Sequence, residues 1–429
     1  MKFEELNLNP ILLTQVKRMG YTETTPIQSR SIPKIMQGKD ILGQAQTGTG
    51  KTAAFALPLL HRLLKLPRGT IRALIIAPTR ELAEQIHTSF GELAKATSIR
   101  SVTVYGGVSI GTQKTNLRRK PDIVVACPGR LLDHMRNHTI DLSRIDTLIL
   151  DEADRMLDMG FLKDIRAILK ELPRKRQTML FSATLTKDIR HLATDFMHCP
   201  VSIDIGHSAP AETVSHALYP VSQHLKSKLL IELLRKTDAR SVIVFTRTKH
   251  RAKRVGKQLN DVGFKTVSLQ GNLSQNRRQA ALEGFRNGTY QILVATDIAA
   301  RGIDVSTISH VINFDMPDTV DAYTHRIGRT GRVGRTGDAF TLVTRDDRLM
   351  VETIEKMIVS KIEQRTMDGF NYDAPAPNRP HSRDRNHKFQ GGSKRKTSNF
   401  QKTPSREYSR KKVRPSSQGT KILYRSVHR

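Results

Sequence analysis

Short runs of apolar residues alternate along the chain with longer segments in which apolar residues recur at helical spacing. Each run is apolar throughout, as expected for a strand that is buried on both faces of a sheet. Strands of this kind separated by helices are typical of a parallel sheet with helices on both sides. The runs form two sets, 73–77, 123–126, 148–150 and 179–181, and then 242–245, 292–295 and 311–314.

A polar stretch around Gly206–Ser222, which contains Pro210 and Pro220, separates the two sets. Proline and polar residues in such a position favour a connection between folded units. We therefore predict an α/β fold with one lobe over residues 1–207, a linker over 208–222 and a second lobe over 223–365. A last amphipathic segment, 348–364, predicts a closing helix with one apolar side formed by Leu349, Ile354, Met357, Ile358 and Ile362.

The charge of the chain restricts its partners. Its 429 residues include 71 Lys and Arg against 40 Asp and Glu, a formal charge of +31, which favours a nucleic acid or an anionic membrane surface. No apolar stretch approaches the ~20 residues that span a bilayer, and the N-terminus lacks the pattern of a secretory signal. Two cysteines, Cys127 and Cys199, exclude a disulfide framework and a CxxC zinc site. These features predict a cytoplasmic protein that binds nucleic acid and no membrane.

The basic charge is densest at the C-terminal end. Residues 366–429 carry 16 basic and 4 acidic side chains and few Leu or β-branched residues, a composition that predicts a disordered basic tail. Aromatic side chains in such a tail could stack on bases. The six candidates are Phe370, Tyr372, Phe389, Phe400, Tyr408 and Tyr424. A solubilising tail without a specific target is the alternative, and the sequence does not decide between the two.

A glycine-rich segment predicts a phosphate site. Ala45-Gln46-Thr47-Gly48-Thr49-Gly50-Lys51-Thr52 follows the apolar Ile41-Leu42 and precedes a helix-compatible stretch, 53–60. In a P-loop the glycines let backbone N–H groups approach phosphate oxygens, the lysine reaches the β- and γ-phosphates, and the hydroxyl binds Mg²⁺. Ala45 replaces the first glycine of the strict pattern, so a tight turn before a helix is the alternative.

An acidic cluster, Asp151-Glu152-Ala153-Asp154, directly follows the apolar run that ends at Leu150. A buried strand of a parallel sheet delivers such residues to its carboxyl end, where α/β folds bind ligands. One of these carboxylates could hold Mg²⁺ through a water, and its neighbour could orient or deprotonate an attacking water. An isolated acidic cluster is more often a helix N-cap, but its combination with an upstream P-loop favours nucleotide hydrolysis.

With these two elements the chain resembles the DEAD-box ATP-dependent RNA helicases of superfamily 2, whose motifs appear in order over about residues 1–365. The first lobe contains segments similar to that family's motifs at Gly20-Tyr21, Thr25-Pro26-Ile27-Gln28, Pro78-Thr79-Arg80-Glu81-Leu82, Gly106-Gly107, Pro128-Gly129-Arg130 and Ser182-Ala183-Thr184. The second contains Val244-Phe245-Thr246-Arg247, Gln270-Gly271, Gln275, Arg278, Ala295-Thr296-Asp297, Ala300-Arg301-Gly302-Ile303-Asp304 and His325-Arg326-Ile327-Gly328-Arg329-Thr330-Gly331-Arg332. Within the family, the start and the short lobes look most like the bacterial RhlE-like group.

The resemblance implies two RecA-like lobes and an RNA-stimulated ATPase with ATP and magnesium as cofactors. Gln28 is the candidate for reading adenine, because a Gln amide can pair with both N7 and the N6 amine. The resemblance implies that Tyr21 stacks on the base and that Asp304 contacts the ribose. It also implies that Lys51, Asp151 and Glu152 act with the arginine fingers Arg329 and Arg332, and that Thr52 and Asp151 hold Mg²⁺. Cofactor contacts are expected from Tyr21, Gln28, Thr47, Gly48, Thr49, Gly50, Lys51, Thr52 and Asp304.

The resemblance further implies coupling between the ATP and RNA sites through Ser182, Thr184 and His325. For Thr184 or Thr186, a simple helix N-cap is the alternative. RNA backbone contacts, which position a protein without reading sequence, are expected on loops of both lobes. The matched residues are Thr79, Arg80, Gly107, Gly129, Arg130, Thr246, Gly271 and Thr296. Cys127 stands where the family commonly has Thr, and a thiol is the weaker hydrogen-bond partner.

Three other classes are open. Gln28 and the sequence Asp-Glu-Ala-Asp of the acidic cluster disfavour a DNA helicase or translocase. The set of motifs in both lobes disfavours a non-helicase P-loop ATPase. An ATP-gated RNA clamp would use the same residues as a helicase. No separate RNA-recognition domain is visible, so little sequence specificity is expected. Ribosome assembly, mRNA decay and cold adaptation are open as pathways, with ribosomal or RNA-decay proteins as candidate partners.

Overall fold

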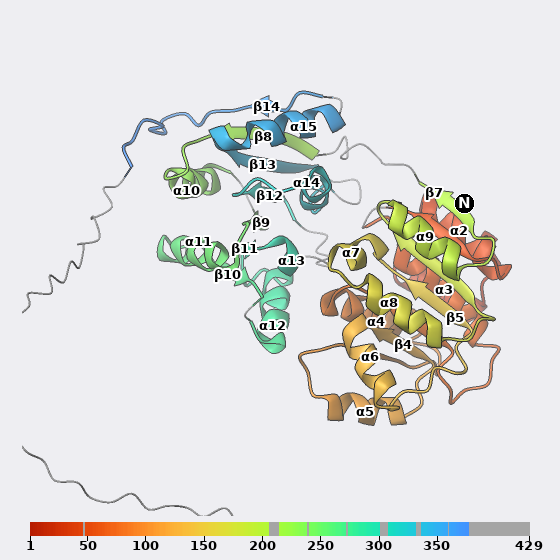
Figure 1. Cartoon of the computed structure of the whole chain (residues 1–429). Helices are drawn as coiled ribbons and strands as arrows, with labels where there is room; N and C mark the ends of the chain where they lie inside the picture. Colours follow the sequence, from red (N-terminus) through yellow and green to blue (C-terminus); the bar gives the residue numbers. More distant parts are fainter. Residues whose placement is uncertain are drawn as a thin grey trace, which may run out of the picture. The chain divides into compact units, whose positions relative to one another are not determined.

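The computed structural model describes residues 1–45, 48–205, 214–237, 240–271, 273–300, 308–331, 336–358 and 360–376. Within the unit Met1–Pro377 these residues form two lobes, each built around one seven-stranded parallel sheet (Figure 1). Two such lobes confirm the predicted α/β class. Among the described residues, no helix combines the length and the apolar composition that crossing a membrane would require.

The first sheet has the strand order β3-β4-β2-β5-β6-β1-β7. All of its strands run parallel, so consecutive strands are joined by helices. The strands are β1 (Ile41–Gln44), β2 (Ala73–Ile76), β3 (Ser101–Val104), β4 (Ile123–Ala126), β5 (Thr147–Leu150), β6 (Gln177–Ser182) and β7 (Val201–Asp204). The helices are η1 (Phe3–Leu6), α1 (Pro10–Arg18), α2 (Pro26–Met36), α3 (Lys51–Leu63), α4 (Arg80–Leu93), α5 (Ile110–Arg118), α6 (Pro128–Arg136), α7 (Ala153–Asp158), α8 (Leu162–Glu171) and α9 (Lys187–Phe196).

The core of the first lobe lies on both faces of this sheet. Successive strand residues alternate between the faces, so Ile75 packs in one apolar cluster while its neighbours Leu74 and Ile76 pack in the other. Phe55 of α3 and Phe90 of α4 belong to the first cluster. Because both faces are covered, the central strands are apolar at every position, which is the pattern that made them recognisable in the sequence.

The second sheet has the order β10-β11-β9-β12-β13-β8-β14 and is also parallel throughout. Its strands are β8 (Val214–Pro220), β9 (Val242–Phe245), β10 (Thr266–Leu269), β11 (Ile292–Ala295), β12 (His310–Asn313), β13 (Gly337–Val343) and β14 (Glu363–Gln364). Its helices are α10 (Lys226–Lys236), α11 (Lys249–Asp261), α12 (Gln275–Arg286), α13 (Asp297–Ala300), α14 (Val320–Ile327), η2 (Arg345–Asp347) and α15 (Arg348–Ile358).

The structure differs from the predicted linker and closing helix. Strand β8 lies inside the stretch predicted as a linker, and it pairs with β13 and β14 in the second sheet. Its polar residues suggested a connection because only some of its side chains face the core. The closing helix ends at Ile358 rather than Gln364, and Leu349 and Met357 are 77% and 64% exposed instead of packing on the sheet.

The beginning of the predicted tail is part of the second lobe. Met367 belongs to the core cluster there, and Phe370 and Tyr372 pack against that cluster with their rings edge to face at 4.8 Å. Lys236 Nζ donates to the carbonyl of Asp368 at 2.6 Å. These two aromatic residues therefore contribute to the core and not to base stacking. The other four predicted stacking residues lie outside the described residues.

This packing predicts that a chain ending at residue 365 is less stable than one ending at residue 376. The shorter chain loses the buried Met367 and the partly buried Phe370 and Tyr372, which should lower the free energy of unfolding of the second lobe by about 2–4 kcal/mol. Denaturant unfolding of both truncations beside the full chain measures the difference. The chain ending at 376 should unfold like the full chain, and equal midpoints for the two truncations would contradict the prediction.

Candidate active site

The carboxyl ends of three neighbouring strands, β5, β6 and β1, bring the phosphate loop, the acidic cluster and the Ser182–Thr184 segment together. A cavity of about 370 Å³ opens at this edge. Its lining includes the predicted residues Tyr21, Gln28, Gly48, Gly50, Lys51, Thr52, Asp151 and Glu152. Residues more than one hundred positions apart in the sequence therefore surround one pocket. This pocket lies where α/β sheets bind ligands.

The phosphate loop has the backbone that its glycines permit. Gly48 and Gly50 adopt φ angles of +90° and +92°, which L side chains rarely adopt, and α3 begins at Lys51 directly after Gly50. Lys51 is 6% exposed, and its Nζ donates to the carbonyl of Ala45 at 2.7 Å, across the turn of the loop. The ammonium group is thus held inside the ring that a phosphate would occupy. Thr47 lies outside the described residues.

Gln28 connects the predicted adenine-reading segment to the phosphate loop. Its Oε1 accepts the N–H of Thr25 at 3.0 Å, and its Nε2 donates to the carbonyl of Gly50 at 3.1 Å. An amide oxygen accepts two hydrogen bonds and an amide nitrogen donates two, so this geometry is compatible with a bidentate contact to adenine. Tyr21 lies on the same cavity, with its ring stacked on that of Phe3 at 6.2 Å. Phe3 was not among the predicted site residues.

The acidic cluster contains two carboxyl groups in different electrostatic environments. Burial raises the pKa of Asp151 to about 6, with the Lys51 ammonium opposing the shift. Burial acts in the same direction on Glu152, but the positive charges of Arg155, Lys51 and Arg329 together outweigh it and lower the pKa to about 2. Arg155 Nη1 lies 2.5 Å from Glu152 Oε2, and both side chains are buried. Glu152 is therefore ionised at neutral pH, as an acceptor for a water proton must be.

Arg155 is a site residue that the sequence analysis missed. It lies three residues after Glu152, and a positive residue at that spacing on a helix is a signal that an ion pair is possible. Glu152 itself precedes α7 with a φ of +53°, a left-handed conformation that is uncommon for a non-glycine residue. Uncommon backbone of this kind clusters at functional sites.

Thr52 and Asp151 offer the donor set that Mg²⁺ prefers, one hydroxyl and one carboxylate oxygen on the same cavity. One Asp151 oxygen, Oδ1, accepts the N–H of Glu152 at 3.0 Å, which orients the carboxylate. Mg²⁺ usually takes one or two protein ligands together with waters and phosphate oxygens. The two residues therefore fit a magnesium ion bound together with a nucleotide.

The Ser182–Thr184 segment wraps around Asp154. Asp154 Oδ2 accepts the N–H groups of Ala183 and Thr184 at 2.9 and 3.0 Å. Ser182 Oγ accepts the N–H of Asp154 at 3.2 Å and donates to the carbonyl of Thr184 at 2.7 Å. The helix N-cap role falls instead to Thr186, whose hydroxyl accepts the N–H of Ile189. The contact with the acidic cluster that the coupling hypothesis requires is thus present.

In the second lobe, helix α14 carries His325 and ends just before Arg329. Arg329 is 4% exposed, and its Nε donates to the carbonyl of His325 at 3.2 Å. Its positive charge contributes to the low pKa of Glu152, and Arg329, His325 and Arg155 line the same small cavity. Burial, with Arg155 adding to it, lowers the pKa of His325 to about 4, so that imidazole is neutral. Arg332 and Asp304 lie outside the described residues.

Each of the eight residues predicted to contact RNA follows the carboxyl end of a strand. The six strands concerned occupy equivalent places in the two sheets. Thr79 and Arg80 follow β2, Gly107 follows β3, and Gly129 and Arg130 follow β4. Thr246, Gly271 and Thr296 follow β9, β10 and β11. These strands are adjacent in each sheet, β3-β4-β2 and β10-β11-β9, so the residues gather at one half of each carboxyl edge. The other half of the first edge holds the cavity with Lys51.

Several of these residues have protein partners. Arg130 Nη1 donates to the carbonyl of Val108 at 3.1 Å and to Gln113 Oε1 at 3.3 Å, so its guanidinium lies against the loop after β3. Thr79 caps α4 by accepting the N–H of Leu82 at 3.2 Å. Thr246 is fully buried, and its hydroxyl lies 3.4 Å from the carbonyl of Thr248. The side chains of these three residues are therefore held by contacts within the protein.

Residues of the two lobes also contact one another within the unit Met1–Pro377. Arg278 of α12 and Glu81 of α4 form a partly buried ion pair with 2.6 Å between Nη2 and Oε1. Arg80 Nη1 donates to Gln275 Oε1 at 3.4 Å. Both pairs join the start of α4 to the start of α12, the helices that follow β2 and β10 at the edges predicted to contact RNA.

Comparison with known proteins agrees with this geometry. The family model for the DEAD/DEAH box helicases matches residues 25–192, and the model for the helicase conserved C-terminal domain matches residues 225–334. The "ATP-dependent RNA helicase CshA" of Limosilactobacillus reuteri is 44% identical over 358 residues, which cover 83% of this chain and 72% of the relative. The chain belongs to the DEAD-box helicases.

Other relatives of this DEAD-box helicase support the same placement. The "DEAD-box ATP-dependent RNA helicase CshA" of Bacillus subtilis is 42% identical over 84% of this chain and 73% of the relative. The solved structure of "S. cerevisiae Dbp5 bound to RNA and ADP BeF3" is 30% identical with a TM-score of 0.77, over 85% of this chain and 95% of that one. These bacterial relatives carry the name CshA, so they support the family but not the RhlE-like subgroup that the sequence suggested.

Gln113 and Cys127 of this DEAD-box helicase contact the backbone of the loops predicted to bind RNA in the first lobe. Gln113 of α5 is buried, donates to the carbonyl of Tyr105 at 2.8 Å and accepts from Arg130, so it joins two of the loops. Burial raises the pKa of the Cys127 thiol to about 12, which keeps it neutral, while its N–H donates to the carbonyl of Val104 at 2.9 Å. Cys127 therefore contributes main-chain geometry at the start of α6.

Gly107 provides a direct test of the first RNA edge. Its φ is +85°, and a Cβ at this position would collide with the guanidinium of Arg80. Gly107→Ala should therefore displace both predicted RNA contacts and weaken RNA binding about tenfold, with the KM for ATP unchanged. Fluorescence anisotropy with a labelled single-stranded RNA measures the affinity. Gly69→Ala is the matched control, because Gly69 has a φ of +91° with open space around its Cα, and an equal loss in both variants would contradict the prediction.

Proposed function

We propose that this DEAD-box ATP-dependent RNA helicase binds RNA across both lobes, unwinds short duplexes locally or remodels RNA–protein complexes, and hydrolyses ATP to release the RNA. The observation that supports this most directly is the single cavity in which the phosphate loop, the acidic cluster and the adenine-reading Gln28 meet. The adjacent half of the same sheet edge carries the loops matched to RNA contacts.

Each residue of the cavity has a chemical task in this proposal. Lys51 neutralises charge on the β- and γ-phosphates once it exchanges the Ala45 carbonyl for a phosphate oxygen. Glu152, ionised and held by Arg155, orients the attacking water and accepts its proton. Thr52 and Asp151 would hold Mg²⁺, which supplies further charge neutralisation at the phosphates.

The second lobe supplies the cation that the transition state needs. Arg329 presents a guanidinium, whose fork suits the spread negative charge of a phosphoryl group in transfer. Arg332 is proposed as its companion from the motif alone. The Asp154–Thr184 contact and His325 then link the state of the nucleotide to the RNA edge.

The finer biological assignments are also proposals. The basic composition and the RNA-bound state of the solved relative support RNA as the partner, without sequence readout. We propose a cytoplasmic location, with ribosome assembly, mRNA decay or cold adaptation as the processes to test. Sequencing of RNA crosslinked to the protein in cells would identify its targets.

The test of this function is ATP hydrolysis with and without nucleic acid. RNA should stimulate the rate, whereas DNA of the same sequence should not, and equal stimulation by DNA would refute the RNA assignment. A strand-displacement assay on a short RNA duplex then separates a helicase from a clamp. A helicase releases the strand in the presence of ATP, while a clamp shows ATP-dependent retention without release.

Deletion of residues 377–429 tests the basic tail. This segment carries 16 basic and 2 acidic residues, and it should neutralise RNA phosphates without specificity. The deletion should weaken RNA binding and flatten the slope of log K against log [salt], because fewer counterions are released. Titrations of the full chain and of residues 1–376 at several salt concentrations measure the slope, and an unchanged slope would show that the tail does not contact RNA.

A further inference from the structure

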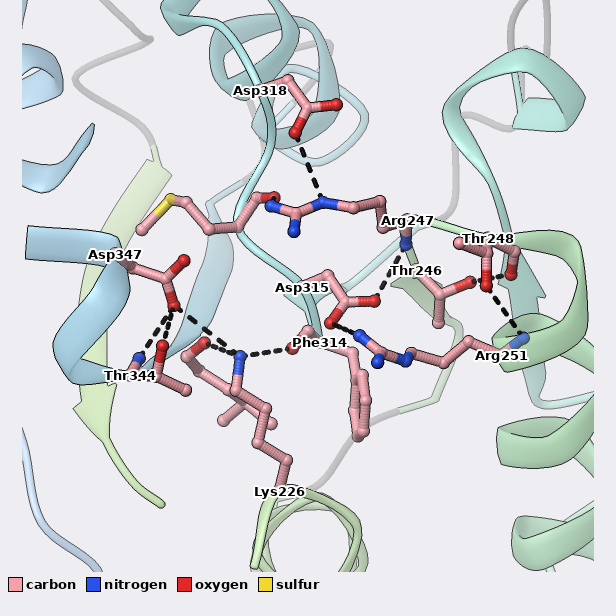
Figure 2. Close-up of polar contacts among 12 residues, drawn as sticks. Lys226, Thr246, Arg247, Thr248, Arg251, Phe314, Asp315, Asp318, Thr344 and Asp347 are labelled. Atoms are coloured by element: carbon pink, nitrogen blue, oxygen red, sulfur yellow. Dashed lines mark hydrogen bonds and ion pairs between the residues drawn. The ribbon is translucent and has the colours of Figure 1, made fainter. Parts of the chain in front are cut away.

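The two sheets have the same order of strands when they are compared position by position. β12, β13 and β8 of the second sheet occupy the places of β5, β6 and β1 in the first. In the first lobe the carboxyl ends of these strands form the cavity with Lys51 and Asp151. In the second lobe the same edge holds a buried cluster of charged side chains instead (Figure 2).

Lys226 takes the place of Lys51 in this cluster. Each lysine is the first residue of the helix that follows its strand, α10 after β8 and α3 after β1. Lys226 is 2% exposed, and its Nζ donates to the carbonyls of Phe314 and Leu342 at 3.1 and 2.8 Å. Its other neighbour is the Asp347 carboxylate, 3.9 Å away (Figure 2). The residues before it, 221–225, include no glycine, so protein groups rather than a phosphate surround this ammonium.

Asp315 lies two residues after the end of β12, at the edge where Asp151 directly follows the equivalent strand β5. Its carboxylate is nearly fully buried and faces the loop after β9 (Figure 2). Oδ2 accepts the N–H of Arg247 at 2.9 Å, and Oδ1 pairs with Arg251 Nη1 at 2.5 Å. Arg247 directly follows Thr246, one of the residues matched to RNA contacts.

Asp315 is itself held from several directions. Its N–H donates to the carbonyl of Phe245 at 3.3 Å, and its own carbonyl accepts from Arg326 Nη1 at 2.7 Å. Arg326 is anchored in turn by the Asp297 carboxylate at 2.6 Å. The carbonyl of the preceding residue, Phe314, is one of the two that bind Lys226. The carboxylate of Asp315 therefore projects from a fixed piece of main chain.

An ion pair between a buried carboxylate and a partly exposed guanidinium is a poor source of stability, because desolvation of the charges offsets their attraction. What it does supply is a defined geometry, which fits a pair that fixes the backbone N–H of an RNA-contacting loop. Thr248 also fixes the start of α11, because its hydroxyl caps this helix by accepting the N–H of Arg251 at 3.2 Å. One carboxylate thereby connects the loop with the first turn of the helix behind it.

We infer that Asp315 is a positioning residue for RNA binding: paired with Arg251, it holds the Thr246–Arg247 loop in the conformation that meets the RNA backbone. The edge that binds the nucleotide in the first lobe serves the RNA site in the second, with Lys226 securing the segment that bears Asp315. This inference rests on the proposed function and names a residue through which the second lobe performs it.

The test compares RNA affinity, measured by fluorescence anisotropy in the presence of a non-hydrolysable ATP analogue, with the kinetics of ATP hydrolysis without RNA. Asp315→Asn leaves one uncharged oxygen, so either the Arg247 N–H or the Arg251 guanidinium must face the amide N–H₂. The RNA dissociation constant should rise about tenfold, while the KM for ATP and the RNA-independent rate stay within twofold. Arg251→Gln, a milder change at a partly exposed side chain, should act in the same direction, and the double variant should bind RNA no more weakly than Asp315→Asn.

Glu232→Gln is the matched control, because it removes one carboxylate from an exposed ion pair with Arg235 in the same lobe and should change neither quantity. An RNA dissociation constant within twofold of wild type in both Asp315→Asn and Arg251→Gln would overturn the inference. So would an equal change in the KM for ATP and in RNA affinity, which would indicate a damaged lobe. Absence of RNA stimulation of ATP hydrolysis in the wild-type protein would instead refute the proposed function. The RNA affinities of wild type and Asp315→Asn, measured by anisotropy, would still test the role of Asp315.

Discussion

Glu152→Gln is expected to lower the rate of ATP hydrolysis at saturating RNA by on the order of 10²–10⁴, while ATP and RNA still bind. Glu152 lies on the nucleotide cavity, and its pKa of about 2 keeps it ionised at every pH at which the protein would be assayed. A glutamine has the same shape but cannot accept the proton of an attacking water. The loss should therefore appear in kcat and in single-turnover rates, not in the KM for ATP.

Glu152→Gln should also lower the stability of the first lobe. Arg155 would lose the partner of its buried guanidinium, and a buried charge without its partner is destabilising. Thermal unfolding measured beside the kinetics separates this effect from the chemistry. Glu171→Gln, at an exposed glutamate of the same lobe, is the control and should leave the rate unchanged. Hydrolysis by Glu152→Gln within tenfold of wild type would show that another group activates the water.

The strands that were predicted from the sequence are those buried on both faces. β4, β9 and β11 coincide with the predicted runs, because every residue in them is buried and apolar. β8 and β10 are among the strands that were missed, since each combines partly exposed positions with polar residues. Burial on both sides leaves a continuous apolar signal, whereas a strand near the edge of a sheet resembles a loop in the sequence.

Site residues were predicted where several of them lie together in a short segment of sequence. Isolated residues that support the site through a single side-chain contact were missed. The phosphate loop and the acidic cluster are contiguous, so their chemistry is visible before any fold is known. Gln113 and Asp315 each depend on a partner that only the fold brings near, whereas the partner of Arg155 lies three residues away and gave a local signal that was missed. A lone Gln or Asp in a sequence gives no sign of such a partner, and the missed residues are accordingly those that hold others in place.

Arg329→Ala is expected to reduce ATP hydrolysis at saturating RNA by on the order of 10³–10⁵, the usual effect of removing an arginine finger. The structure supports a large effect, because Arg329 is nearly fully buried and its Nε is fixed by the carbonyl of His325 at 3.2 Å. Its charge already lowers the pKa of Glu152, so it acts electrostatically on the group that orients the water. Single-turnover hydrolysis with saturating ATP and RNA measures the loss.

Arg329→Lys separates the charge of this residue from its shape. A lysine keeps the positive charge but offers a point rather than a planar fork, so its rate should fall between those of wild type and Arg329→Ala. Arg235→Ala, at an exposed arginine of the same lobe, should have no effect. A loss of less than tenfold in Arg329→Ala would assign the stabilising cation to another residue. Equal rates for the lysine and alanine variants would show instead that the fork itself, which spreads its positive charge over the transferring group, carries the whole contribution.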